Sequence, residues 1–263
     1  MIDLHHHCLP GVDDGPRDWN EAVALCRLAE SEGIETIVAT PHVLRGRWRN
    51  VGVATLRSLA SELQARVGQS PRILLGSECF FVHDIADVLA DGNTVVPLAD
   101  RNYVLIEFAS NAVPPMVEQP LYRMQLEGWT PIIAHPERNL VFQEKPELLA
   151  SLVQLGAKTQ ITAASFTGHF GKEAAASATE WLSSGLVHII ASDAHNTEKR
   201  PPRTREALRV VTEQAGEDVV DALTRRNPTA VLEGRPLVYE PDPVVLRERG
   251  GFLTGLRRLF RTS

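Results

Sequence analysis

The sequence predicts an α/β protein built on a distorted, TIM-like parallel barrel. Short apolar, β-rich segments alternate with helical patterns along the chain, which is typical of βαβ units and a parallel sheet. A residue type that binds metals follows most of the apolar segments, and 263 residues suit a single barrel. The chain has seven strand candidates, one fewer than a regular barrel, so we expect the barrel to be distorted.

The expected strands are short apolar runs of residue types that favour β-structure. They cover residues 2–5, 35–41, 72–77, 103–107, 131–135, 158–163 and 187–192. Apolar residues at helical spacing predict helices between them, over 18–32, 53–67, 115–127, 145–155, 171–184 and 203–225. The Pro-rich segment 234–243 is expected to end the compact domain, which we place at residues 1–240.

Composition and charge narrow the function classes. The formal net charge of −6 argues against a general nucleic-acid binder, and we expect no nucleic-acid partner. We find no apolar run long enough to span a membrane and no secretory signal pattern. The three cysteines, an odd number without C-x-x-C spacing, favour a reducing cytoplasm over a disulfide framework.

Histidines and carboxylates follow the apolar runs. His5 and His7 end the first run, and the later ones lead into His42, Glu78, Glu107, His135, Asp193 and His195. Parallel barrels place their active sites at the carboxyl ends of the strands, so these side chains should converge. A buried carboxylate is costly unless it is paired or binds a cation. We therefore predict a multinuclear metal centre.

Nitrogen and oxygen ligands without thiolates suit Mn²⁺, Fe or Zn²⁺. Such ions lower the pKa of a shared water and bind phosphate oxygens. Asp14 either completes a metal shell or forms the tight turn that Asp-Gly favours. Arg138, three residues after His135, is either a bidentate phosphate contact or a surface arginine. Arg200, in the loop after His195, is a second candidate for the phosphate contact.

The ordered motifs resemble those of the PHP (polymerase and histidinol phosphatase) superfamily. Within it they are similar to the CpsB/CapC-type manganese-dependent protein tyrosine phosphatases of capsule and exopolysaccharide synthesis. The motifs are His-x-His, Pro-Gly-Val-Asp-Asp-Gly, Ala-Thr-Pro-His42, Gly-Ser-Glu78, Ile-Glu107-Phe, Ala-His135-Pro-Glu-Arg138 and Ala-Ser-Asp193-Ala-His195-Asn-Thr, and the match covers about residues 1–235.

This resemblance implies a fold, a site and a function. The fold would be the distorted seven-stranded (β/α)7 barrel of the PHP fold with a trinuclear manganese centre. Its ligands would be His5, His7, Asp14, His42, Glu78, Glu107, His135, Asp193 and His195. Arg138 and Arg200 would be the catalytic arginines that handle phosphate. The substrate would be a phosphotyrosine protein, such as a bacterial tyrosine kinase of polysaccharide export.

Local departures from the family pattern leave the substrate open. The loop Arg45–Arg49 is basic and contains Trp48, and it is expected to favour acidic phosphopeptides. Phe80, Phe81 and Trp48 either frame a phosphotyrosine ring or pack in the core.

Other functions remain as alternatives. His7-Cys8 resembles the start of the H-C-x5-R loop of cysteine-dependent phosphatases, but position 14 is Asp instead of the required Arg. An amidohydrolase would have a bridging lysine where this chain has Glu78 and Glu107. A PHP phosphoesterase acting on a small ester such as histidinol phosphate, and a metal-stabilised scaffold without activity, fit the same ligands.

The C-terminal tail, 241–263, is basic and amphipathic. Residues 245–263 contain five arginines and one glutamate, while apolar side chains recur at helical spacing from Phe252 to Phe260. Such a segment contacts an anionic membrane surface, packs on its own barrel or joins a second subunit in a homo-oligomer. The location expected is therefore the cytoplasm, with peripheral contact at the inner face of the membrane.

Overall fold

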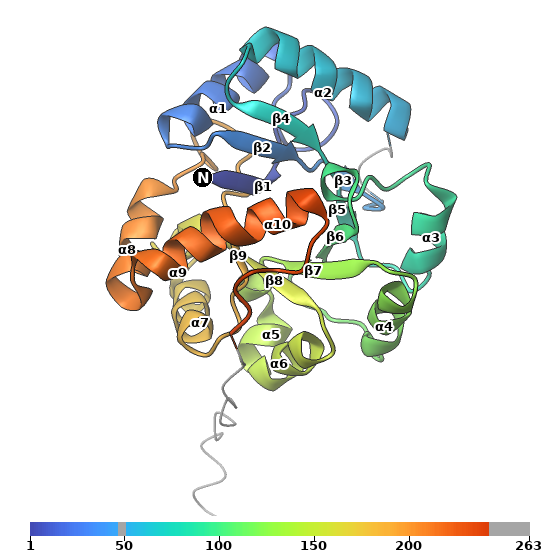
Figure 1. The fold of residues 1–263 in the computed structure, drawn as a ribbon, viewed down its shortest axis with the longest axis vertical. Helices are drawn as coiled ribbons and strands as arrows, with labels where there is room; N and C mark the ends of the chain where they lie inside the picture. Colours follow the sequence, from blue (N-terminus) through green and yellow to red (C-terminus); the bar gives the residue numbers. More distant parts are fainter. Residues whose placement is uncertain (47–50, 242–263) are drawn as a thin grey trace, which may run out of the picture.

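The strands run parallel and lie inside a ring of helices (Figure 1). The computed structural model describes residues 1–46 and 51–241. The strands are β1 (Ile2–His6), β2 (Thr36–Ala39), β3 (His42–Val43), β4 (Arg72–Leu75), β5 (Glu78–Phe80), β6 (Tyr103–Glu107), β7 (Thr130–Ala134), β8 (Lys158–Thr162) and β9 (Ile189–Ala191).

The helices occupy most of the predicted ranges and some others. The α-helices are α1 (Trp19–Ser31), α2 (Val53–Val67), α3 (Ile85–Asp91), α4 (Glu118–Leu126), α5 (Leu140–Glu144), α6 (Pro146–Gln154), α7 (Lys172–Ser183), α8 (Arg205–Ala215), α9 (Glu217–Asp221) and α10 (Asn227–Glu233). Short 3₁₀ turns are η1 (Leu98–Asp100), η2 (Pro136–Arg138) and η3 (Ala163–Ser165), and η4 (Ala222–Arg226) is a π-helical turn.

The strands form two parallel sheets. One sheet has the order β1-β2-β4, and the other has the order β3-β5-β6-β7-β8-β9. An isolated parallel bridge between His6 and Ala194 connects β1 to the segment after β9. The predicted parallel α/β architecture is confirmed, but within the described residues the ladders do not close into the single seven-stranded barrel that we expected.

Two predicted strands, 35–41 and 72–77, end early, at β2 and β4, and the short strands β3 and β5 that follow them were not predicted. Between β2 and β3, Pro41 has no N–H to donate to a ladder. The next strand is interrupted at Gly76, between β4 and β5. Hydrogen bonds still cross both breaks, from Gly76 N to Ala39 O (2.8 Å) and from Glu78 N to Pro41 O (3.1 Å).

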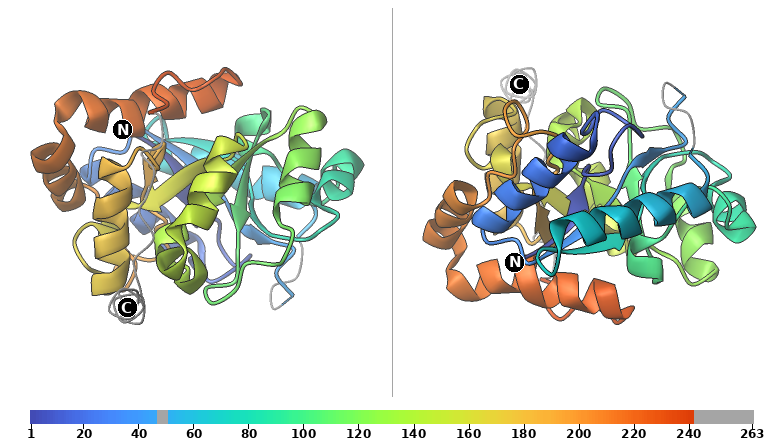
Figure 2. Two further views of the ribbon diagram at one scale, coloured as in Figure 1. Left: turned by 90° about the horizontal axis from the view of Figure 1, so that it is seen from below. Right: turned by 90° about the horizontal axis from the view of Figure 1, so that it is seen from above.

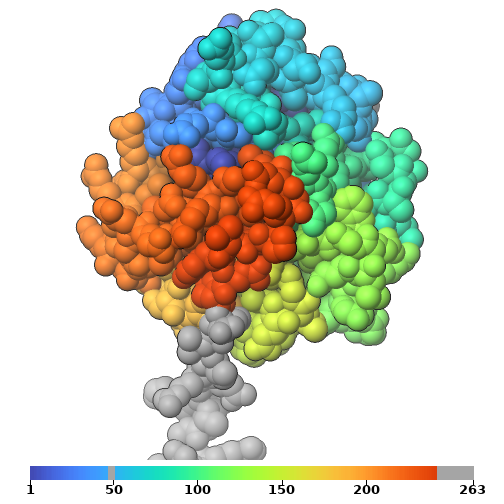
Figure 3. Space-filling view, in the orientation of Figure 1, coloured from blue at the N-terminus to red at the C-terminus, as the bar shows by residue number. Residues whose placement is uncertain are grey.

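The interior is filled by apolar side chains of the strands and is covered at one end by α10. Leu4, Leu105 and Ile132 pack with Ala230 and Val231 of that helix in one buried cluster. α9 and α10 lie beside the N-terminus of β1 (Figure 2) and cover much of the face seen in Figure 3. This leaves the opposite end, where the strands finish, for the polar residues.

Some local predictions were wrong or lie outside the described residues. The single helix expected over 203–225 is divided because α8 ends at Gly216, whose φ is +88°. Helices α3, α5 and α10 were not predicted. Residues 47–50 and 242–263 are not described, so the expectations for Arg47, Trp48, Arg49 and most of the tail stay untested. In the described part of the chain no helix is long and apolar enough to cross a membrane.

The substitution Gly76→Ala should destabilise the protein. A Cβ atom on Gly76 would lie 2.7 Å from Leu98 Cδ2 and 3.1 Å from Val38 Cγ1. Overpacking of this kind should lower the free energy of unfolding by about 1–3 kcal/mol, measured by chemical denaturation. Gly52→Ala is the control, since no described atom lies within 4 Å of its added Cβ. Equal losses in the two variants would contradict the role of close packing at Gly76.

Candidate metal centre

The structure brings the nine predicted ligand side chains together at the ends of the strands. His5 and His7 come from β1 and the residue after it, while Glu78 and Glu107 lie in β5 and β6. The others are Asp14, His42, His135, Asp193 and His195, and each of the nine belongs to at least one group whose ligand atoms lie within 4.8 Å of one another. Eight of them are buried, and Asp14 has a side chain that is 40% exposed.

Four donor atoms surround a first point. The Nε2 atoms of His5 and His7 are 3.1 Å apart. Glu78 Oε2 lies 3.3 and 3.2 Å from these two nitrogens, and Asp193 Oδ1 lies 3.3 and 3.6 Å from them. Metal–ligand bonds of about 2.0–2.2 Å put adjacent tetrahedral or octahedral ligands roughly 2.8–3.6 Å apart. The spacing of His5, His7 and Asp193 therefore fits one cation, and Glu78 Oε2 lies next to both histidines.

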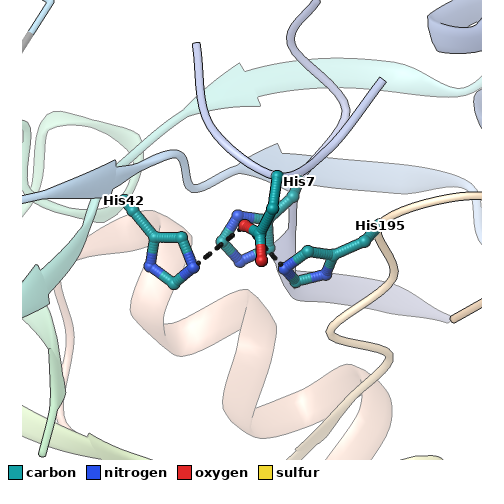
Figure 4. Close-up of side chains that lie close together, drawn as sticks. His7, His42 and His195 are labelled. Atoms are coloured by element: carbon teal, nitrogen blue, oxygen red, sulfur yellow. Dashed lines mark ion pairs between the residues drawn. The ribbon is translucent and has the colours of Figure 1, made fainter. Parts of the chain in front are cut away.

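Two further groups share residues with the first. His42 Nδ1 lies 2.9 Å from Glu78 Oε2 and 3.6 Å from Glu107 Oε2, while His135 Nε2 lies 2.8 Å from Glu78 Oε1. On the other side, Asp14 Oδ1 lies 3.3 Å from His42 Nε2 and 3.4 Å from His195 Nε2. Figure 4 shows the rings of His7, His42 and His195 gathered around a carboxylate, with dashed lines for its ion pairs with His42 and His195.

Three buried ligand atoms find no hydrogen-bond partner among the described residues. They are Glu78 Oε2, Asp193 Oδ1 and His42 Nδ1. His42 Nδ1 is close to Glu78 Oε2, but not in hydrogen-bond geometry. Such buried polar atoms cost free energy unless something satisfies them. Their position among other nitrogen and oxygen donors fits bound cations.

The backbone is strained at two of these positions. His135 has a φ of +33° and Asp193 a φ of +53°, in the left-handed region that residues other than glycine rarely adopt. Each residue lies just after a strand, β7 or β9. Such strain persists where the surrounding structure holds it and is frequent at functional sites.

The carboxylates raise the pKa values of two histidines. Burial lowers the pKa of His5, but the negative charges of Glu78 and Asp193 outweigh it and raise that pKa to about 9. Burial likewise opposes the effect of Glu78 and Asp14 on His42, whose pKa rises to about 11. Both imidazoles are therefore protonated at neutral pH when no metal is bound.

At three other ligands the effect of burial on the pKa prevails over the neighbouring opposite charges. Burial, with Arg138 nearby, lowers the pKa of His135 to about 4. Burial, with His7 nearby, lowers the pKa of His195 to about 4. Burial also raises the pKa of Glu107 to about 7, and the neighbouring charge of Glu78 adds to this rise. The neutral imidazoles offer lone pairs to a metal without losing a proton.

Asp13 and Gln160 orient the first two histidines, and sequence reasoning missed both. Asp13 Oδ2 lies 2.7 Å from His7 Nδ1 and accepts a bond from the His42 amide. Gln160 Oε1 lies 2.7 Å from His5 Nδ1. A partner of this kind fixes the tautomer of a metal-binding histidine. The available signals were the Asp-Asp-Gly motif and a glutamine inside a predicted strand.

Arg138 and Arg200 lie beside the ligands, as the motifs suggested. Both donate to Asp193 Oδ2, Arg138 through Nη1 and Arg200 through Nη2, the latter at 2.6 Å. They line a pocket of about 280 Å³ together with ligands such as Glu78 and His135. Their guanidinium groups therefore border the space where a ligand of the centre would bind.

Among the remaining candidates, only Arg45 reaches the pocket within the described residues. Its Nη1 donates to both carboxylate oxygens of Glu107 at 2.8 Å. Phe81, considered as a frame for a substrate ring, is 5% exposed and packs on Phe108 in the core. Cys8 is buried, and the neighbouring Cys26 and burial hold its pKa well above the usual value, which does not suit a nucleophile.

Comparison with known proteins finds the same family over nearly the whole chain. The family model described as "Capsular polysaccharide synthesis, CpsB/CapC" matches residues 1–233. The tyrosine-protein phosphatase YwqE of Bacillus subtilis (strain 168) is 38% identical over 96% of this chain and 100% of its own length. The tyrosine-protein phosphatase CpsB of Streptococcus pneumoniae is 29% identical over 88% of this chain and 98% of its own length.

Comparison with solved structures leads to the same relatives. A structure of YwqE and CpsB, described as unique metal-dependent tyrosine phosphatases, superposes with a TM-score of 0.89 at 37% identity and covers 94% of this chain and 100% of that one. A β-aspartyl dipeptidase of Fervidobacterium islandicum-AW-1 superposes with a TM-score of 0.54 at 13% identity over 92% of this chain and 75% of that one. The second likeness shows a shared fold only.

Metal binding should release protons and weaken as the pH falls. The pKa values of His5 and His42 are raised to about 9 and 11, so a metal must displace protons from both at pH 7. Lower pH favours the protonated, metal-free state, so affinity should fall with pH. Calorimetry in two buffers of different ionisation enthalpy should show release of about one to two protons. His83→Ala, at an exposed histidine, is the control, and buffer-independent heats would contradict the prediction.

Proposed function

The chain belongs to the CpsB/CapC family of capsular polysaccharide synthesis, and on this basis we propose that it is a metal-dependent protein tyrosine phosphatase. The observation that carries the proposal is a cluster of nine nitrogen and oxygen donor residues, six of which line one pocket together with Arg45, Arg138 and Arg200. This combination suits a phosphate monoester, whose oxygens need both cations and hydrogen-bond donors. The relatives named tyrosine-protein phosphatases support the choice of substrate.

We propose that the metal ligands are the nine residues expected from the sequence. The support is the 3.1–3.6 Å spacing of the first group, the sharing of Glu78 between groups and the unpartnered ligand atoms. Mn²⁺ is the proposed ion, three per site, with Fe and Zn²⁺ as alternatives, because imidazole and carboxylate ligands suit all three. Bound divalent ions would supply an activated water for hydrolysis and positive charge for the phosphate.

Arg138 and Arg200 would be the side chains that bind the phosphate during the reaction. Both arginines line the pocket, and their guanidinium groups would donate N–H groups to phosphate oxygens there. Such charge-assisted bonds are strongest when negative charge builds up on the phosphate in the transition state. Asp193, which accepts from both arginines, would hold them in place. Asp13 and Gln160 would keep the His7 and His5 rings oriented.

We also propose the barrel type and the domain boundaries. The two sheets would together form the distorted (β/α)7 barrel of the PHP fold, supported by the bonds that join β1 to the segment after β9, such as His7 N to Ala194 O (2.9 Å). Residues 1–240 would be the phosphatase unit and 241–263 a separate basic tail.

We also propose the cellular role that the family description suggests. The substrate would be a tyrosine kinase of polysaccharide export, and the enzyme would act in the cytoplasm. Contact of the tail with the inner face of the membrane, or with a second subunit, rests on its five arginines and its apolar spacing. The basic loop from Arg45 would favour acidic sequences around the phosphotyrosine.

Turnover of phosphotyrosine peptide should depend on metal. Chelation should abolish hydrolysis, and Mn²⁺ should restore it, because the ligand groups need a cation to act on a phosphate ester. The measurement is phosphate release from the peptide, compared with a small ester such as histidinol phosphate. Full activity in metal-free protein would refute the mechanism, and preference for the small ester would refute the assigned substrate.

Glu107→Ala and Arg138→Ala should separate metal binding from phosphate binding. Glu107→Ala should lower the metal content because it removes a carboxylate from one ligand group. Arg138→Ala should retain the metal but lower kcat/KM on phosphotyrosine peptide by about a hundredfold, equivalent to about 3 kcal/mol. Elemental analysis and steady-state kinetics measure the two effects. Arg123→Ala, at an exposed arginine on α4, is the control. A kcat/KM of Arg138→Ala equal to that of the wild type would rule out the role of Arg138 in phosphate binding.

A further inference from the structure

A second recess adjoins the metal-ligand pocket at Arg138. It has a volume of about 370 Å³ and is lined by Leu140 and Gln143 of α5, by Phe170, and by Glu173 in the first turn of α7. Arg138 completes its wall, and the same residue lines the ligand pocket. The two spaces therefore share a side chain that is placed to bind phosphate.

Arg138 is held between a carboxylate and an aromatic ring. Its Nη1 donates to Asp193, and its Cζ lies 4.4 Å from the centre of the Phe170 ring. A guanidinium at this distance is attracted to the face of the ring. The two contacts together limit the rotation of the guanidinium, so Phe170 helps to determine where its N–H groups point.

The segment that carries Phe170 also contacts the loop of the second arginine. His169 Nε2 lies 3.0 Å from the Lys199 carbonyl, to which it can donate, and the His169 and Phe170 rings meet edge to face at 5.1 Å. The segment is folded on itself, with bonds from His169 N to Ala164 O (3.1 Å) and from Gly171 N to Gly168 O (3.0 Å). The connection between β8 and α7 therefore supports both Arg138 and the loop that leads to Arg200.

The chemistry of the recess suits an aromatic group attached to a phosphate. Leu140 is 52% exposed, and Phe170 is partly exposed, so two large apolar side chains face solvent next to a guanidinium. Burial of such surfaces against a ring is favourable, whereas a small polar ester would leave them in water. In phosphotyrosine the ring and the phosphate share one oxygen atom, so a surface for the ring must adjoin the phosphate site. The shared Arg138 meets this requirement.

We propose that this recess receives the phenol ring of the substrate phosphotyrosine while its phosphate faces Arg138 and Arg200. The inference rests on the proposed function and adds a selectivity site to it. Leu140 contacts the ring and selects for it, and Phe170 is a positioning residue that holds Arg138. This location replaces Phe81, which the structure buries in the core.

The ring site is tested by binding of two phosphonates that differ in the ring. Calorimetry on the metal-loaded protein compares phenylphosphonate with methylphosphonate. The wild type should bind phenylphosphonate more tightly, and Leu140→Ala should reduce that preference about fivefold without changing methylphosphonate affinity. Leu126→Ala is the control, since Leu126 is 70% exposed on α4. An unchanged preference in Leu140→Ala, or none in the wild type, would overturn the proposal.

Phe170 is tested by its effect on phosphate binding. Phe170→Ala should weaken both phosphonates, unlike Leu140→Ala, and lower kcat on phosphotyrosine peptide by about tenfold, because Arg138 loses the ring that orients it. Phe170→Tyr, which keeps an aromatic face, should stay within about twofold of the wild type. Wild-type affinities and kcat in Phe170→Ala would refute the positioning role.

The results of these experiments also distinguish the proposal for the recess from the proposed phosphatase activity. A wild type that prefers phenylphosphonate through Leu140 but does not hydrolyse phosphotyrosine peptide would refute the phosphatase assignment and support the recess as a site for aromatic phosphates. A wild type that hydrolyses the peptide while Leu140→Ala keeps the full ring preference would support the phosphatase and refute the recess.

Discussion

The buried negative charge of Glu78 is the constraint around which the strand ends are arranged. Its side chain is fully buried, and its two oxygens lie 2.8–3.3 Å from nitrogens of His5, His7, His42 and His135. Uncompensated burial of a carboxylate costs several kcal/mol, so these groups must approach it together. Burial would raise the pKa of Glu78, but His5 and His42 hold it well below its usual value. The four histidines come from three segments of the chain, at β1, β3 and the end of β7, and one anion thereby unites distant segments.

The fold delivers these groups through irregularities at the ends of the strands. Pro41 and Gly76 interrupt two strands just before His42 and Glu78, and left-handed backbone at His135 and Asp193 redirects the chain after two others. At the opposite end α10 closes the apolar interior, so the stability of the core and the chemistry of the site occupy separate ends. Because of this separation, the polar end can hold strained backbone and unpartnered ligand atoms, and packing of the core offsets their cost in free energy.

Much of this arrangement could be predicted from the sequence because its signals are local. Each buried strand is a short apolar run, and the ligand candidates follow those runs directly, so the segments at His5, His42 and His135 were recognisable. The break at Gly76 was not, since it depends on close packing against the distant Leu98. The same holds for Gln160 on His5 and for Phe170 on Arg138, which are contacts between residues separated by many positions. Residues 47–50 and the tail, on which two predictions rest, lie outside the described residues.

Anomalous diffraction from crystals of the protein grown with Mn²⁺ tests the central claim most directly, because it locates metal independently of turnover. The account predicts three manganese peaks at the ends of the strands, with Glu78 bonded to more than one ion and His5 and His7 bonded to the same ion. Glu78→Gln should lose occupancy at the peaks that it shares. A map without peaks at these residues, or a single peak that does not touch Glu78, would contradict the account.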